Sequence, residues 1–342
     1  MLQDEHYMAR CIQLAKLGMG NVAPNPMVGA VIVHEQKIIG EGYHKKYGEA
    51  HAEVNAIQAV IDQSLLSQST IYVSLEPCSH HGKTPPCADL LVEKKFKRVV
   101  IGCRDANSNV DGKGIQRLRN AGIESTVGIL EDECRNVNKR FFTWHEKKRP
   151  FVILKWAQTK NGLIDSGIQN DKVNWVSVPE VQTIVHTWRS QNQAILVGRK
   201  TIENDNPTLT VRVVKGTNPI RVILDSNLQL PQHRKIFNED AETIIINKQI
   251  SKSTNNVHFI KIDEMNVNTI LDALYNFGIQ SVLIEGGRAT LQSFIDSKIW
   301  DEARVIFGQK TFRQGTKAPT IDRAPSSVEQ FFGDTIVTYL NK

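Results

Sequence analysis

The stretch that decides the fold of this chain opens with His51-Ala52-Glu53 and closes with Glu76-Pro77-Cys78-Ser79-His80-His81-Gly82-Lys83-Thr84-Pro85-Pro86-Cys87. Between these motifs, residues 70–75 are β-branched and apolar, which predicts a central strand that leads into Cys78. His51, Cys78 and Cys87 supply one imidazole and two thiolates, the kinds of ligand that zinc prefers. Three protein ligands leave the fourth tetrahedral position for water, so the stretch predicts an open zinc site.

Glu53 follows the imidazole ligand by two residues and can move protons without ligating the metal. Zinc lowers the pKa of its water to about 7, so a hydroxide nucleophile exists at neutral pH. Glu53 would take the proton of the water and deliver it to a leaving nitrogen, as base and acid in turn. His-x-Glu or a lone Cys is weak evidence by itself, but the whole combination is the pattern of zinc deaminases that act on amino-substituted bases.

The composition is that of a globular protein with material for two domains, because 40% of the 342 residues are hydrophobic and 23% are charged. The longest apolar runs fall short of the roughly 20 residues that a membrane helix needs, so no membrane partner is expected. The N-terminus lacks the basic and apolar regions of a signal peptide, which favours a cytoplasmic location. Five cysteines do not make a disulfide framework, and Cys11, Cys103 and Cys134 are expected to be reduced core residues.

The net charge of +6 would suit a phosphorylated substrate and cofactor. The densest basic clusters, residues 94–98 and 146–149, are better interpreted as solvated ends of helices or strands than as a nucleic-acid surface. No nucleic-acid partner is therefore expected. The sequence leaves the oligomeric state open, a homo-oligomer included.

Strands and helices alternate along the first half, which is typical of layered α/β domains. Asp4 is expected to cap a first helix that ends at Gly18. The further expected elements are a hairpin of strands 28–33 and 38–42, helix 52–60, strand 70–75, helix 88–94, strand 99–102, helix 115–120, strand 123–127 and helix 137–142. The charged run at residues 144–150 ends in Pro150 and predicts a linker, which gives domains 1–146 and 147–342.

The second half has a Gly-Gly turn between a buried strand and a helix, at Gly286 and Gly287. Bare backbone N–H groups at a helix N-terminus can bind an anion, although the turn is not the Gly-x-Gly-x-x-Gly fingerprint of a Rossmann domain. The expected elements of this half are strands 151–156, 194–198, 220–224, 243–246, 257–260 and 281–284, with helices 179–189, 267–277 and 291–297.

The chain resembles the bifunctional riboflavin-biosynthesis deaminase/reductase family in both halves. The first half carries the long Cys–Cys insert, Ala23-Pro24-Asn25-Pro26-Met27-Val28-Gly29, Gly42-Tyr43-His44, Cys103-Arg104-Asp105-Ala106-Asn107 and Gly112-Lys113-Gly114. The second half carries the run at residues 197–212, Leu224-Asp225-Ser226 and Ile284-Glu285-Gly286-Gly287. The resemblance implies an α/β chain with a cytidine-deaminase-like three-layer domain and a dihydrofolate-reductase-like domain.

The same resemblance implies two reactions. The first is zinc-dependent hydrolytic deamination of a diaminopyrimidinone ribosyl phosphate, and the second is reduction of its ribosyl group to ribityl by NADPH. The implied substrate contacts of the deaminase are Asn25, His44, His80, Lys83, Asp105 and Asn107, which could otherwise be polar loop residues. The implied substrate contacts of the reductase are Arg189, Leu209, Arg212 and Glu285. The implied NADPH contacts are Ala157, Trp175, Thr201, Asp205, Ser226, Gly287, Arg288, Ala289, Thr290, Leu291, Gln292 and Ser293.

The chain departs from the family pattern at three positions of the second half. Asn161 and Asn206 stand where the family has Asp, and Val173 stands where a substrate-binding Ser is common. Two alternatives to the family function also stay open. One is a nucleoside or nucleic-acid base deaminase with an accessory domain. The other is a non-enzymatic zinc-stabilised module, whose fourth ligand could be His80 or His81.

Overall fold

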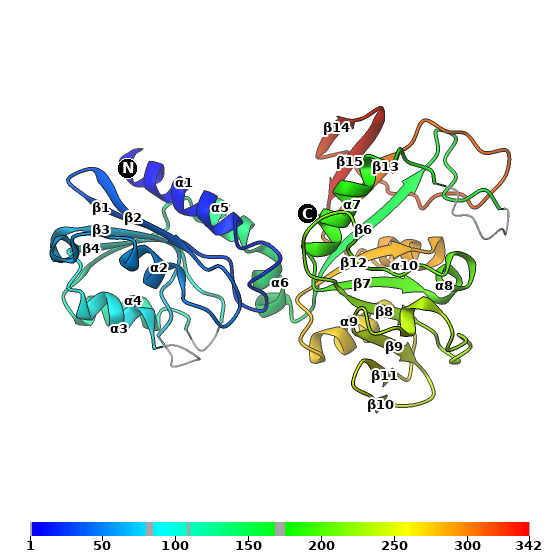
Figure 1. Ribbon diagram of the computed structural model, residues 1–342, viewed down its shortest axis with the longest axis horizontal. Helices are drawn as coiled ribbons and strands as arrows, with labels where there is room; N and C mark the ends of the chain where they lie inside the picture. Colours follow the sequence, from blue (N-terminus) through cyan, green and yellow to red (C-terminus); the bar gives the residue numbers. More distant parts are fainter. Residues whose placement is uncertain (1, 80–84, 108–109, 168–174, 342) are drawn as a thin grey trace. The chain divides into compact units, whose positions relative to one another are not determined.

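The structure is a computed structural model that describes residues 2–79, 85–107, 110–167 and 175–341 (Figure 1). His80, Lys83 and Val173 therefore lie outside the described residues. The chain divides into two compact units, Met1–Lys147 and Lys148–Lys342. Of the helices described, none is both long and apolar enough to cross a membrane.

The first unit is built on a five-stranded mixed sheet with the order β2-β1-β3-β4-β5. Strand β1 (Gly29–His34) pairs antiparallel with β2 (Lys37–Tyr43) and with β3 (Thr70–Leu75). Strand β3 pairs parallel with β4 (Arg98–Cys103), which pairs parallel with β5 (Glu124–Val127). The predicted hairpin and the predicted central strand before Cys78 are confirmed.

Helices cover both faces of this sheet, so the predicted three layers are confirmed (Figure 1). One apolar core lies between the sheet and the helices α2 (Ala52–Gln58), α3 (Cys87–Glu93) and α4 (Lys113–Asn120). The other core lies beneath α1 (Leu2–Lys16), α5 (Glu131–Val137) and α6 (Lys139–Lys147). A short 3-10 helix, Gln63–Gln68, leads into β3.

Two predictions about the ends of helices in this unit are wrong. Asp4 lies inside α1 and does not cap it, because its carboxylate accepts hydrogen bonds from Arg98 at 2.9 and 3.0 Å and from the Tyr72 hydroxyl at 2.8 Å. The helix expected to end at residue 142 continues to Lys147, although the two units still divide inside the charged run, between Lys147 and Lys148. An ion pair of 2.6 Å between Arg135 and Glu146 joins this last turn to α5.

The second unit contains a ten-stranded sheet with the order β10-β11-β9-β8-β7-β12-β6-β13-β15-β14. The strands are β6 (Phe151–Gln158), β7 (Ala194–Gly198), β8 (Ile220–Leu224), β9 (Thr243–Asn247), β10 (Lys252–Ser253), β11 (Val257–Lys261), β12 (Ser281–Gly286), β13 (Glu302–Phe307), β14 (Ser327–Phe331) and β15 (Asp334–Leu340). The central part of the sheet, β11-β9-β8-β7-β12-β6-β13, is parallel throughout. Strand β10 at one edge and strands β15 and β14 at the other are antiparallel to their neighbours.

Four helices pack on the two faces of this second sheet. Helices α9 (Val267–Asn276) and α10 (Arg288–Asp296) contribute to the large apolar core on one face. Helices α7 (Val181–Ser190) and α8 (Arg199–Asp205) contribute to the smaller cores on the other. Strand β12 lies between β7 and β6, although it follows both in the chain. Ligands of open α/β sheets bind at the carboxyl ends of strands where the strand order reverses, so the ends of β7, β12 and β6 are the expected site.

Candidate active sites

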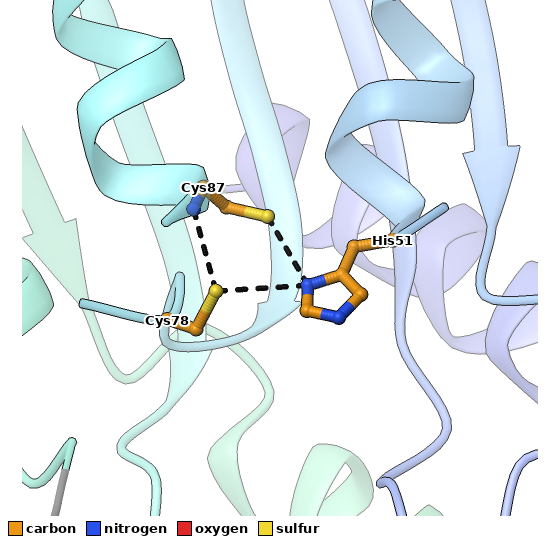
Figure 2. Close-up of side chains that lie close together, drawn as sticks. All are labelled: His51, Cys78 and Cys87. Carbon is orange, nitrogen blue, oxygen red and sulfur yellow. Dashed lines mark hydrogen bonds between the residues drawn. The ribbon is translucent and has the colours of Figure 1, made fainter. Parts of the chain in front are cut away.

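The three predicted zinc ligands converge at one point of the first unit (Figure 2). His51 immediately precedes α2, Cys78 follows β3, and Cys87 is the first residue of α3. The His51 Nδ1 atom lies 3.3 Å from the Cys87 sulfur and 3.6 Å from the Cys78 sulfur. Ligand atoms around a tetrahedral zinc with ordinary Zn–S and Zn–N bonds lie about 3.6 Å apart. The donor set therefore fits a zinc ion.

The start of α3 fixes Cys78 independently of any metal. The backbone N–H of Cys87 donates to the Cys78 sulfur at 3.3 Å, and the N–H of Ala88 donates to the Cys78 carbonyl at 3.1 Å. The hydrogen bond from the Cys87 thiol, with a further one from His51, lowers the pKa of Cys78 to about 4. The same pairing, together with burial, raises the pKa of Cys87. A thiolate is thus already favoured at the position where a metal needs one.

Glu53 lies in the first turn of α2 and is only 3% exposed. Burial is the main cause that raises its pKa to about 7, and the nearby Cys78 adds to the effect. Cys87, Cys78 and His51 all influence the pKa of Glu53, so the carboxyl group lies beside the donor set. A carboxyl group with a pKa near neutrality can both accept and donate a proton at working pH.

Asn25 and His44, two of the predicted substrate contacts, lie next to the metal ligands and contact each other. The His44 ring is 5.3 Å from the His51 ring, measured between centroids. Its Nδ1 lies 3.0 Å from the Ala50 carbonyl, and its Nε2 lies 3.1 Å from the amide nitrogen of Asn25. A carbonyl can only accept, so Nδ1 carries the proton and Nε2 accepts. Burial lowers the pKa of His44, which agrees with this neutral form.

Asp105 and Asn107 follow β4, on the segment that leads to α4. Asp105 is largely buried and accepts the backbone N–H of Asn107 at 2.7 Å. Burial raises the pKa of Asp105 to about 7. The other two predicted contacts of this unit, His80 and Lys83, are among the residues that the structure does not describe.

In the second unit, two strand-to-helix turns face each other at the carboxyl edge of the sheet. Gly198 ends β7 and precedes α8, and Gly287 follows β12 and precedes α10 without a side-chain cap. A Cβ atom on Gly198 would lie 2.9 Å from the Thr290 hydroxyl, and one on Gly287 would lie 3.5 Å from the Thr201 hydroxyl. Bare backbone, two hydroxyls and an uncapped helix start fit a phosphate group of a cofactor.

The other predicted cofactor contacts are spread over the same edge and beyond it. Ala157 is in β6, Ser226 follows β8, Asp205 ends α8, and Arg288 to Ser293 form the first part of α10. Burial raises the pKa of Asp205, and the nearby Asp165 adds to the effect. Trp175 is half exposed, and its backbone carbonyl accepts a hydrogen bond from the Lys310 ammonium at 2.6 Å.

A buried charge cluster lies at the end of β12. Arg189 of α7 donates from Nε and Nη2 to the two carboxylate oxygens of Glu285 at 2.9 and 2.8 Å. The Lys155 ammonium lies 3.8 Å from the same carboxylate. Burial alone would raise the pKa of Glu285, but Arg189 and Lys155 outweigh it and lower the pKa to about 2. Lys155 was not predicted, although a lysine within the apolar run of β6 was a signal that a buried carboxylate faces it.

Arg212 and Leu209 lie on the segment after α8. The Arg212 side chain makes polar contacts, whereas the Leu209 side chain is buried. The Arg212 guanidinium donates to the hydroxyls of Thr208 and Thr210. Its backbone N–H donates to Nδ1 of His186 at 3.0 Å, and burial together with Arg189 and Arg212 lowers the pKa of His186 to about 4. Leu209 is 2% exposed and packs in the apolar core near β7, so only its backbone is available to a substrate.

Two of the three departures from the family pattern have structural partners here. The Asn161 amide donates to the Phe312 carbonyl at 2.8 Å and accepts from the Phe312 N–H at 3.3 Å, a two-way pairing that a carboxylate cannot make. Asn206 ends α8 at a positive φ of 40°, which Asn tolerates, and its oxygen accepts the Lys235 N–H at 3.0 Å. The third departure, Val173, is not among the described residues.

Comparison with protein families identifies both halves. A family model for the cytidine and deoxycytidylate deaminase zinc-binding region matches residues 1–103, which include His51, Cys78 and Cys87. A family model for the RibD C-terminal domain matches residues 150–325. The predicted α/β class and the cytidine-deaminase-like first domain are confirmed, and the second domain is a RibD C-terminal domain.

Individual relatives extend over nearly the whole chain. Riboflavin biosynthesis protein RibD of Aquifex aeolicus is 40% identical over 319 residues, covering 91% of this chain and 88% of that protein. The namesake from Escherichia coli is 33% identical over 328 residues. The solved diaminohydroxyphosphoribosylaminopyrimidine deaminase/5-amino-6-(5-phosphoribosylamino)uracil reductase of Thermotoga maritima is 37% identical, with a TM-score of 0.88 and 98% of each chain covered. Acinetobacter baumannii RibD is 32% identical with a TM-score of 0.89.

Proposed function

Because the chain belongs to the RibD family of bifunctional deaminase/reductases of riboflavin biosynthesis, we propose that it deaminates a diaminopyrimidinone ribosyl phosphate and then reduces the ribosyl group of the product. The observation that carries the proposal is the convergence of His51, Cys78 and Cys87 beside the buried Glu53. Residues 1–146 would carry the first reaction and residues 147–342 the second. The cytoplasm is the proposed compartment.

In the deaminase, His51, Cys78 and Cys87 would hold one zinc ion and leave one coordination position to a water molecule. When bound, zinc supplies a Lewis acid that lowers the pKa of that water towards neutrality. The supporting observations are the spacing of the three donors and the thiolate that the start of α3 stabilises at Cys78. The donor set matches that of catalytic zinc in base deaminases, where a further carboxylate stays outside the metal shell.

Glu53 would move the protons of the hydrolysis. Its carboxylate accepts a proton from the attacking water as the oxygen bonds to the ring carbon, and then returns it to the amino nitrogen as the carbon–nitrogen bond breaks. Water and substrate are consumed, and ammonia and the oxo product leave. The buried position of Glu53 beside the donor set supports this role, because a proton carrier must reach both the water and the leaving group.

Substrate recognition in this unit would fall to Asn25, His44, His80, Lys83, Asp105 and Asn107. His44 is held as a neutral ring by Ala50 and Asn25, which makes it a fixed neighbour of the site and not a mobile charge. Asp105 and Asn107 lie on the segment after β4. The segments that carry these residues would together hold the pyrimidine and its ribosyl phosphate over the metal.

In the reductase, NADPH would lie along the carboxyl edge of the sheet, with a phosphate at the turns of Gly198 and Gly287. When bound, the cofactor supplies hydride. Ala157, Trp175, Thr201, Asp205, Ser226 and the residues from Gly287 to Ser293 would line it. The close approach of the two turns supports this placement, because a Cβ atom at either glycine would point towards a hydroxyl of the other turn, at Thr290 or Thr201.

The phosphorylated intermediate would bind near Arg189, Leu209, Arg212 and Glu285. The cations Lys155, Arg189 and Arg212 outnumber the single carboxylate of Glu285, so the cluster favours a dianionic phosphate. Arg189 already uses its planar fork on Glu285, whereas Arg212 contacts threonine hydroxyls that a phosphate could replace. We therefore assign direct phosphate contact to Arg212 and a fixed, more distant charge to Arg189.

One incubation tests the proposal. The purified chain is mixed with the diaminopyrimidinone ribosyl phosphate, with and without NADPH, and the products are followed by mass spectrometry. The oxo product should form in both samples and the ribityl product only with NADPH. Deamination of an oligonucleotide or a nucleoside would favour the simple base-deaminase alternative, and the absence of any turnover would favour a zinc-stabilised module.

A further inference from the structure

Glu76 is a buried carboxylate that the proposed chemistry leaves unused. It directly follows β3 and precedes the ligand Cys78 by two residues, and it is 3% exposed. Its backbone N–H donates to the Cys103 carbonyl at 3.0 Å, which extends the pairing of β3 with β4 by one residue. The side chain is therefore fixed at the end of the central strand, between the metal ligands and the segment that follows β4.

The carboxylate of Glu76 binds backbone N–H groups that are far away in the sequence. One oxygen accepts from Gly114 at 3.0 Å and from Ile115 at 3.2 Å. The other oxygen accepts from Gly112 at 3.0 Å and from Asp105 at 3.3 Å. Gly114 and Ile115 lie in the first turn of α4, so Glu76 fills the role of a helix N-cap from a distant strand.

At Gly114, the start of α4 also packs tightly against the backbone next to Glu76. A Cβ atom at this position would lie 2.1 Å from the Pro77 carbonyl oxygen, a distance that no side chain can occupy. The start of α4 thus rests directly on the backbone between Glu76 and Cys78. A single carboxylate and one close backbone contact together set the distance from the metal ligands to the segment that carries Asp105 and Asn107.

We propose that Glu76 is a positioning residue of the deaminase, which holds Asp105 and Asn107 at the correct place over the metal centre for substrate binding. The inference rests on the proposed deamination. The backbone N–H of Asp105 donates to Glu76, and the Asp105 carboxylate in turn accepts the N–H of Asn107. The Glu76 carboxylate therefore fixes the positions of both residues.

The metal ligands do not depend on this carboxylate in the same way. Cys78 is held by the N–H groups of Cys87 and Ala88, and His51 and Glu53 belong to α2. Loss of the Glu76 contacts should therefore displace the substrate contacts more than the metal or the proton carrier. The expected signature is a raised KM for deamination, with bound zinc and kcat largely kept.

Glu76→Gln tests this directly in the full chain. A glutamine keeps the size of the side chain but replaces one accepting oxygen by an NH2 group, which opposes the N–H donors it meets. We expect one zinc per chain, kcat within about threefold of wild type and KM raised about tenfold, which corresponds to about 1.4 kcal/mol. Reduction of the separately supplied oxo intermediate should be unchanged, and a wild-type circular dichroism spectrum together with bound zinc reports that the first unit is folded.

Glu76→Asp keeps the negative charge but shortens the side chain by one methylene, so it weakens the same contacts and decides the matter if Glu76→Gln does not fold. It should also raise KM with zinc retained. Asp89→Asn is the matched control, because Asp89 joins α3 to α4 by an exposed ion pair with Arg117, and its KM should equal that of wild type.

An unchanged KM in the folded variants overturns the inference. A loss of kcat in proportion to a loss of zinc also overturns it, because a merely structural role for Glu76 would give that result. A wild-type chain that releases no ammonia would refute the proposed function, and this inference with it. An active wild type with unaffected variants would refute only the role given to Glu76.

Discussion

Replacing Glu285 by Gln should destabilise the second unit severely. The carboxylate is bound by both donors of the Arg189 fork at 2.8 and 2.9 Å and lies 3.8 Å from the Lys155 ammonium. The neutral amide would leave two largely buried cations without a counter-charge. Removing one partner of such a pair costs about 3–5 kcal/mol. For a unit of this size, the melting temperature should fall by roughly 10 °C.

The pH dependence of the same pair has a definite sign. The pKa of Glu285 falls from its ordinary value of 4.5 to about 2 in the folded protein. The ionised carboxylate thus contributes about 3 kcal/mol of stability. This contribution is complete above pH 4.5 and is lost as the pH falls towards 2. The difference in stability between wild type and Glu285→Gln should therefore shrink as the pH is lowered through this window.

Calorimetry of the two proteins at neutral and acidic pH measures both effects. Glu242→Gln is the matched control, because Glu242 forms a more exposed pair with His258 in the same unit and should cost less than about 1 kcal/mol. A Glu285→Gln protein that melts within about 2 °C of wild type would show that Arg189 and Lys155 do not need the carboxylate. The reasoning about uncompensated buried charge would then be refuted.

Three further predictions concern the second unit. Arg212→Ala should raise the KM of reduction for the phosphorylated intermediate at least tenfold, since a charge-assisted contact is lost, and steady-state kinetics with an unchanged KM would contradict the phosphate contact. Gly198→Ala places a Cβ atom 2.9 Å from the Thr290 hydroxyl and should weaken NADPH binding about tenfold or more in a fluorescence titration, while equal affinity would refute the proposed cofactor position. Asn161→Asp loses the donor to the Phe312 carbonyl and should lower the free energy of unfolding by about 1 kcal/mol in urea titrations. An equally stable variant would show that the asparagine found here in place of the family's Asp does not stabilise the unit.

Most elements of the fold could be predicted because their apolar patterns are local. The β-branched run of β3 and the apolar run of β1, which a short turn joins to β2, predict strands without any knowledge of the rest of the chain. Strand β13 was not predicted, because Glu302 and Arg304 interrupt its apolar pattern. These two side chains bind each other at 2.6 Å, and the Arg304 guanidinium lies over the Trp188 ring, which compensates their burial. Such compensation is visible only once the sheet is assembled.

The candidate sites also contain residues that the sequence predicts and residues that only the structure shows. The zinc donors could be predicted from residue type and spacing, because metal binding demands particular atoms and the strand between them sets the geometry. His186 could not be predicted, and the apolar run around Lys155 indicates only that a counter-charge faces it, because the partners of both residues meet through the packing of β6, α7 and β12. Glu76 belongs to the same motif as Cys78, yet its partners lie on the segment after β4 and on α4, so only the tertiary structure shows its contacts.

The proposed deamination depends above all on a zinc ion held by His51, Cys78 and Cys87, with Glu53 beside it as the carrier of protons. Ammonia release by Glu53→Gln, measured on protein whose zinc content has been determined, tests this most directly. The variant should hold one zinc per chain, lose deamination by a factor of about 10²–10⁴, and still reduce the supplied oxo intermediate with NADPH. Near-normal ammonia release by the zinc-loaded variant would contradict the account.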